Sequence, residues 1–85
     1  MSYADQADPV FPGTFEAALD RLKNRRKVYR DGWNGKGMYI ELQVPDAGSM
    51  NTLPYIFMIT AQGERVPWVA SHTDLLSKDW RILGN

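Results

Sequence analysis

The sequence contains no cysteine and only one histidine, His72. Without cysteine, the chain can form neither a disulfide framework nor a thiolate metal site. One histidine cannot supply a multi-histidine metal centre within a single chain. We therefore expect no metal and no cofactor.

Long apolar runs and net charge are missing as well. No segment approaches the ~20 apolar residues of a membrane span, and the N-terminus lacks the charged-then-apolar order of a signal peptide. Lys and Arg number 10, as do Asp and Glu, so the formal net charge is +0. Any attraction for an anion must then come from local patches. These absences predict a soluble intracellular protein with no membrane partner.

What is present suits one small domain. The chain has 85 residues, of which 44% are hydrophobic and 24% are charged, an ordinary globular composition. A chain of this size buries only roughly 60–65% of the surface of its unfolded state, so oligomerisation is a natural source of extra stability. Residues 1–13 are polar and acidic and predict an N-terminal arm, whereas residues 14–85 predict a single domain.

The spacing of apolar residues predicts an α+β fold. Phe15, Ala18, Leu19 and Leu22 recur at helical spacing after Thr14, a suitable N-cap, so an amphipathic helix is expected to about residue 24. Short strands are expected at 28–30, 38–44, 54–60, 65–69 and 80–83, and a short second helix at 71–77. Together these strands predict a small antiparallel sheet of four to five strands.

Residues 54–60 are apolar on both faces of the expected strand. In so small a domain this predicts a helix on one face and a second chain or a ligand on the other. The following strand contains Pro67, which cannot donate to a ladder and so places that strand at an edge of the sheet.

The stretch from Gly32 to Tyr39 combines three glycines, two aromatic residues, an amide and a lysine. Glycine allows close backbone approach, tryptophan offers a flat face and lysine brings mobile positive charge. This combination suits a planar anionic ligand such as a nucleotide. The alternative is a tight turn whose Trp33 fills the core.

Two further groups of residues allow both a structural and a functional interpretation. Six cations without an intervening carboxylate form a basic patch from Arg21 to Arg30, which is either a solvated surface or a phosphate-binding one. Nucleic acid is the less favoured partner, because the chain as a whole is neutral.

Ser71, His72 and Asp74 are too close in sequence to converge as a catalytic triad, and Ser71 with Asp74 fits a helix capping box. We therefore expect no enzyme.

The tryptophans differ in their expected roles. Trp80, in the last strand, is expected in the core, whereas Trp33 and Trp68 lie beside glycine or proline at loop edges. There a ring can be shared between the core and a ligand, because nucleotide bases stack on such rings.

The order of several short motifs resembles the Thoeris anti-defence protein 2 family of small phage proteins. The resemblance spans about residues 14–83 and rests on these segments: Phe15-Glu16-Ala17-Ala18-Leu19, Gly32-Trp33-Asn34-Gly35-Lys36-Gly37-Met38-Tyr39, Leu53-Pro54-Tyr55-Ile56, Val66-Pro67-Trp68-Val69-Ala70-Ser71, Thr73-Asp74 and Asp79-Trp80. It implies a phage or prophage protein acting in the bacterial cytoplasm. That protein would sequester cyclic ADP-ribose isomers made by TIR-domain defence proteins, without cleaving them. It also implies a homotetramer with ligand pockets between protomers and, in some members, a separate site for cyclic dinucleotides of CBASS defence.

The same resemblance implies the ligand-binding residues. Trp33 would stack on the ligand, beside the other members of its motif, Asn34, Lys36 and Tyr39. The second motif would contribute Trp68, Ser71, Thr73 and Asp74, and Arg30 is a candidate phosphate contact. Asp74 retains its alternative role as a helix cap.

Three features depart from the family pattern. Asp31 stands where relatives often have a basic residue, which weakens local phosphate attraction, and His72 stands where they commonly have glutamine. The arm of residues 1–13 is longer than usual. A nucleic-acid-binding regulator that uses the Arg21–Arg30 patch remains the alternative function.

Overall fold

The computed structural model describes residues 11–48 and 53–84. Helix α1 spans Phe15–Lys23, and helix α2 spans His72–Leu76. The five strands are β1 (Val28–Arg30), β2 (Tyr39–Gln43), β3 (Tyr55–Ile59), β4 (Arg65–Pro67) and β5 (Trp80–Ile82). They form one antiparallel sheet in the order β4-β3-β2-β1-β5. The α+β prediction is therefore confirmed, with five strands.

Both predicted helix starts are confirmed by their caps. The Thr14 hydroxyl accepts a hydrogen bond from the Ala17 amide at 3.3 Å, which satisfies one of the free N–H groups at the start of α1. Ser71 and Asp74 form the predicted capping box of α2, since each side chain accepts a hydrogen bond from the other's backbone amide at 3.0 Å.

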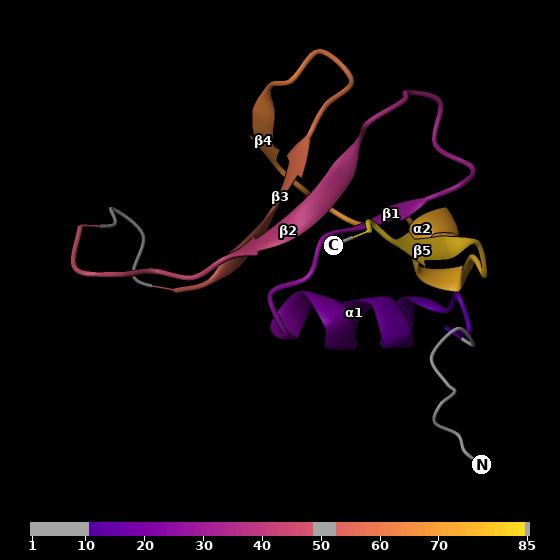
Figure 1. Cartoon of the computed structure of the whole chain (residues 1–85), viewed down its shortest axis with the longest axis horizontal. Coiled ribbons are helices and arrows are strands. Elements are labelled where there is room, and N and C mark those ends of the chain that lie inside the picture. Colours follow the sequence, from indigo (N-terminus) through magenta and orange to yellow (C-terminus); the bar gives the residue numbers. More distant parts are fainter. Residues whose placement is uncertain (1–10, 49–52, 85) are drawn as a thin grey trace.

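The core lies between α1 and one face of the sheet. Paired residues of an antiparallel sheet lie on the same face, so the aligned residues Val28, Ile40 and Met58 point together toward the helix. Val28, Ile40 and the α1 residues Ala18 and Leu22 are all fully buried. Figure 1 shows α1 beneath β1 and β5, with the β2–β3 hairpin extending past the end of the helix.

Strand β3 has a core face and a face turned away from α1. Ile56 and Met58 pack against the buried cluster, as the sequence predicts for the helix-covered face. Tyr55, Phe57 and Ile59 alternate with them and lie on the other face. Only Phe57 is buried there, beneath the Arg65 guanidinium, which lies 3.8 Å from the centre of its ring. In this single chain, every residue of β3 except Phe57 remains partly exposed.

Edge strands lie at both ends of the sheet. Strand β4 carries Pro67 and forms one edge, as predicted. Strand β5 forms the other edge, where the Trp80 amide donates to the Gly13 carbonyl at 3.0 Å. Phe11 also packs against the core cluster. The described end of the expected N-terminal arm therefore lies on the domain; the rest of the arm, residues 1–10, falls outside the described residues.

Candidate functional site

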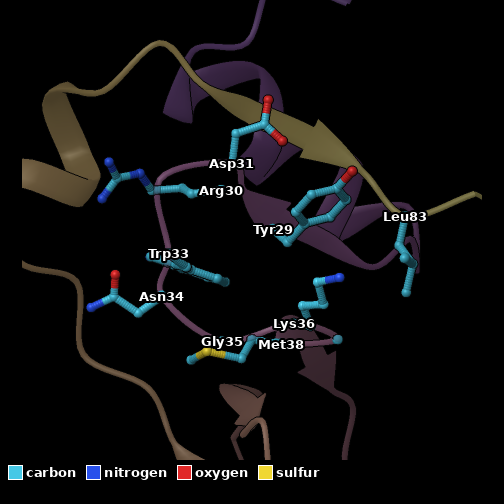
Figure 2. Close-up of a pocket in the computed structure, with 10 residues that line it drawn as sticks. Tyr29, Arg30, Asp31, Trp33, Asn34, Gly35, Lys36, Met38 and Leu83 are labelled. Atoms are coloured by element: carbon cyan, nitrogen blue, oxygen red, sulfur yellow. The ribbon is translucent and has the colours of Figure 1, made fainter.

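The loop between β1 and β2 encloses a hollow of about 560 Å³. Its wall comes from the end of β1, the loop itself and the end of the chain (Figure 2). The lining residues are Tyr29, Arg30, Asp31, Trp33, Asn34, Gly35, Lys36, Gly37, Met38 and Leu83. We call this hollow the loop pocket. Its volume lies within the range usual for small-ligand sites, roughly 300–1,000 Å³.

The Trp33 side chain contacts the core and also lines the loop pocket. Its indole N–H donates to Asp74 Oδ1 at 3.2 Å, and its ring meets Trp80 edge-on at 5.4 Å between centroids. Its backbone amide donates to the Arg30 carbonyl at 3.2 Å. Figure 2 shows the ring directed into the pocket. The two sequence interpretations of Trp33 are thus combined, because the ring packs against the core and also lines the pocket.

Arg30 lines the same pocket, but its guanidinium is bound to two carboxylates. Nε donates to Asp79 Oδ1 at 2.8 Å, and Nη1 donates to Asp74 Oδ1 at 2.9 Å. Only 12% of the Arg30 side chain is exposed. In Figure 2 the guanidinium extends to the outer side of the loop. The Asp79 hydrogen bond raises the pKa of Arg30, so its positive charge is permanent and is compensated within the protein.

Asp74 connects the second helix to the loop. One oxygen caps α2, and the other accepts hydrogen bonds from Arg30 and Trp33. Burial alone would raise the pKa of Asp74, but these hydrogen bonds together lower it below the usual value. Asp74 therefore stays ionised at neutral pH and fixes the direction of the indole.

Asp79 holds the first turn of the loop. Its Oδ2 accepts a hydrogen bond from the Gly32 amide at 2.7 Å, and its carbonyl accepts one from the Asp31 amide at 3.0 Å. The hydrogen bond from Arg30 is the main cause that lowers the pKa of Asp79. Sequence reasoning treated Asp79 only as part of a motif, because its partners lie far away along the chain.

The far side of the loop is fixed by close packing. A Cβ atom at Gly35 would come within 2.6 Å of Met38 Sδ and 2.7 Å of Ala61 Cβ, so this position requires glycine. The next residue, Lys36, projects toward the Tyr29 side of the pocket in Figure 2. Among the described residues, Lys36 has no ion-pair partner. Its charge is thus available to a ligand.

The structure brings together only some of the predicted site residues. Trp33, Asn34, Lys36 and Arg30 line the loop pocket, although Asn34 extends away from its centre in Figure 2. The others do not line it: Tyr39, Trp68, Ser71, Thr73 and Asp74. Asp74 acts on the pocket through Trp33 and Arg30.

Trp68 and Tyr39 have identifiable surroundings elsewhere. Trp68 packs with Trp80 and Phe15 at 6.1 Å between ring centroids in each case, so it belongs to the aromatic core. Tyr39 lies on the face of the sheet away from α1, with the Lys27 ammonium 5.0 Å from its ring centre.

Sequence reasoning missed the lining residues that the fold supplies from outside the glycine-rich motif. Tyr29 is the largest of them, and Leu83 adds apolar surface. Leu83 is far away in sequence and joins the pocket because β5 pairs with β1. Tyr29 could have been found from strand alternation, since its neighbours Val28 and Arg30 both face α1.

Within residues 11–48 and 53–84, no three His, Cys, Asp or Glu side chains are grouped so as to hold a metal ion. Ser71 serves the helix cap, which confirms the capping interpretation over the triad. None of the described helices is long and apolar enough to cross a membrane.

Fold and site together define a small α+β domain with a ligand-sized hollow beside a tryptophan held on the core. Two comparisons with known proteins identify the family of this domain. Residues 13–83 match the model of the Thoeris anti-defense 2-like domain, and the chain belongs to that family. It is also 39% identical over 83 residues to "Thoeris anti-defense 2" of Bacillus phage SP01, an alignment covering 82% of this chain and 93% of the relative. The resemblance drawn from the motifs is therefore confirmed, and the chain is a member of a phage anti-Thoeris family.

Proposed function

We propose that this protein binds cyclic ADP-ribose isomers in the loop pocket and sequesters them from a Thoeris effector. The observation that carries the proposal is the presentation of the Trp33 ring to a pocket that also contains the unpaired Lys36. A flat aromatic face suits a purine base, and a free ammonium suits a phosphate. Some cyclic dinucleotides of CBASS defence share both chemical groups and are further candidate ligands.

We propose that binding occurs without cleavage. The ionised groups near the loop are engaged in holding it: Asp74 and Asp79 accept hydrogen bonds from Arg30, Trp33 and Gly32. A general base needs a free lone pair directed at a substrate proton. Carboxylates bound to arginine and to backbone amides are better suited to fixing the shape of a site than to proton transfer.

We further propose a homotetramer with pockets completed between protomers. The support is the sheet face turned away from α1, where Tyr39, Tyr55 and Ile59 are only half-buried. Val69 and Leu76 are 88% and 80% exposed and add apolar surface near α2. Burial of such surfaces between copies would supplement the small core of one chain.

The alternative nucleic-acid function is less well supported, because carboxylates neutralise some of the cations in the Arg21–Arg30 patch. Arg30 is neutralised by two carboxylates, and Arg21 pairs with Asp20 at 3.0 Å. Of the other cations, Lys23 lies at the end of α1, and Arg25, Arg26 and Lys27 line a hollow of about 360 Å³ at the turn before β1, together with residues 83–84. A surface that reads a nucleic-acid backbone usually offers a longer positive stripe.

The test combines calorimetry with recovery of the ligand. Purified protein is titrated with cyclic ADP-ribose isomers, then heated, and the supernatant is assayed for intact ligand. We expect micromolar or tighter binding followed by release of unchanged ligand. Recovery of a cleaved product would instead indicate an enzyme. Absence of binding to the isomers and to cyclic dinucleotides, with salt-sensitive binding to DNA or RNA, would favour the alternative.

A further inference from the structure

A second hollow of about 550 Å³ lies along the outer edge of β5. Its lining comes from the segment before α1, from β1, and from β5 with the turn that precedes it: Phe11, Pro12, Tyr29, Lys78, Arg81 and Ile82. We call it the edge pocket. None of the residues predicted from the sequence to bind ligand lines it, and it is not part of the hollow enclosed by the loop.

Gly13 determines how this edge is built. Its φ of +81° is unfavourable for residues with a side chain, and a Cβ there would lie 2.5 Å from the Lys78 carbonyl. Glycine thus lets the chain approach β5 closely enough for its carbonyl to accept from the Trp80 amide. The same turn places Phe11 and Pro12 at the rim of the edge pocket.

Tyr29 lines both pockets and separates them. It lies on the sheet face away from α1, directly paired with Arg81 of β5. Within the described residues its hydroxyl has no hydrogen-bond partner, although it is half-buried. A ligand that crosses from one pocket to the other would pass this hydroxyl and could form a hydrogen bond with it.

An ion pair also joins the loop pocket to the edge pocket. Asp31 lines the loop pocket, Arg81 lines the edge pocket, and Arg81 Nε lies 3.1 Å from Asp31 Oδ2. The two side chains are 53% and 46% exposed, so the pair is solvated and weak. An incoming anion can therefore recruit the Arg81 guanidinium at little cost in stability.

Positive charge and apolar surface are distributed unequally between the pockets. The loop pocket has Trp33, Met38 and Leu83, which suit a planar or apolar group. In the edge pocket, Lys78 has no ion-pair partner among the described residues and lies beside Arg81. Lysine and arginine together are the usual partners of phosphate oxygens.

We infer that the two pockets form one elongated site that takes a nucleotide with its base against Trp33 and a phosphate beyond Tyr29, against Lys78 and Arg81. The inference rests on the proposed function, because it extends the same site. It adds a phosphate contact outside the glycine-rich motif to the one proposed for Lys36, and it gives Tyr29 contact with the part of the ligand that joins the base to this phosphate.

The test compares Lys78→Gln with Lys23→Gln, titrating each with cyclic ADP-ribose at several salt concentrations. Lys23 is the matched control, because it is an exposed lysine at the end of α1 and its loss changes net charge equally. We expect Lys78→Gln to weaken binding roughly tenfold at low salt, as for one charge-assisted hydrogen bond, and Lys23→Gln to bind like the unmodified protein. Raising salt from about 50 mM to about 500 mM should then weaken Lys78→Gln less than the control, because screening has one fewer contact to affect.

Tyr29→Phe provides a second measurement that retains the ring and the fold. Loss of the hydroxyl should weaken cyclic ADP-ribose binding about fivefold, in line with one neutral hydrogen bond of about 1 kcal/mol. If Lys78→Gln and Tyr29→Phe both bind like the unmodified protein, the elongated site is wrong while the proposed function stands. If the unmodified protein binds no cyclic nucleotide at all, the elongated site and the proposed function are both wrong.

Discussion

Arg30 and Asp79, 49 positions apart in the sequence, join the beginning of the loop to the beginning of β5 through a hydrogen bond of 2.8 Å between Nε and Oδ1. The second oxygen of Asp79 accepts from the Gly32 amide at 2.7 Å. A single carboxylate thus holds both the last residue of β1 and the first glycine of the loop. Because Trp33 follows directly, this arrangement determines where the indole ring lies.

Replacement of Asp79 by asparagine should loosen the loop without removing a ligand contact. The amide can still accept from one N–H, but it carries no charge, so the largely buried Arg30 guanidinium keeps only its ion pair with Asp74. We expect the free energy of unfolding to fall by about 1–3 kcal/mol. Ligand affinity, measured by calorimetry at a temperature where the variant is fully folded, should also fall.

Asp20→Asn is the matched control for this change. Asp20 forms an exposed ion pair with Arg21 at 3.0 Å, so the same substitution alters net charge without touching the loop. The control should retain both its melting temperature and its affinity. Equal effects in the two variants would show that Asp79 has no special role.

Trp33→Ala should weaken ligand binding more than it destabilises the fold. Its ring lines the loop pocket, and stacking of a base on such a ring is worth about 1–3 kcal/mol. That corresponds to an increase in Kd of roughly fivefold to 150-fold, measured by calorimetry. Trp80, in contrast, is fully buried and has no pocket surface, so Trp80→Ala should chiefly lower the melting temperature.

Trp80→Phe keeps the comparison informative if Trp80→Ala does not fold. It retains an aromatic ring in the core while losing the hydrogen bond from the indole to the Asp74 carbonyl. At equal folded fraction, Trp33→Ala should bind the ligand more weakly than Trp80→Phe. The reverse order would contradict the assignment of Trp33 as the stacking surface.

The fold was largely predictable because its signals are local. The helical spacing after Thr14, the capping box at Ser71 and the proline at 67 each act within a few residues, and the structure contains all three features. The separation of core and outer faces in β3 also follows from simple alternation.

The site was less predictable because it depends on strand order. Leu83 reaches the loop pocket only because β5 pairs with β1, a pairing that no short motif encodes. Arg30 has the residue type of a phosphate ligand, yet its charge is balanced by two carboxylates more than forty positions away. Sequence alone shows the cation but not its partners.

The protein should lose stability in acid through Asp79 and Asp74. Both have a pKa in the folded state below the ordinary value of 3.8, so both stabilise the fold at neutral pH. As pH falls below about 4, the unfolded state takes up protons first, and the advantage is lost as the folded-state pKa values are crossed. Thermal unfolding followed from pH 7 to pH 3 should show this decline.

Asp79→Asn tests the source of that decline. The variant lacks one of the two carboxylates, so its melting temperature should depend less steeply on pH below about 4 than that of the unmodified protein. Asp20→Asn should retain the original steepness. A parallel decline in all three proteins would place the acid sensitivity elsewhere.

Asp31→Asn should strengthen binding of a phosphate-bearing ligand. Asp31 lines the loop pocket with a negative charge and also occupies Arg81 at 3.1 Å. Its neutralisation removes a repulsion and releases Nε of Arg81, whose Nη1 still donates to the Trp80 carbonyl at 2.8 Å. The exposed ion pair contributes little to stability. We expect severalfold tighter binding of cyclic ADP-ribose with an almost unchanged melting temperature, measured by calorimetry and thermal unfolding. Weaker binding would mean that Asp31 itself contacts the ligand.

Ile59→Glu tests the proposed assembly. Ile59 lies on the face of β3 turned away from α1, where a charge would be tolerated in a single chain but would have to be desolvated between two chains. We expect light scattering to report a smaller assembly than for the unmodified protein, with the folded far-ultraviolet spectrum retained. Gln62→Glu, in the exposed turn between β3 and β4, adds the same charge outside that face and should leave the assembly unchanged. An unmodified protein that remains monomeric at high concentration would rule out pockets completed by a second copy.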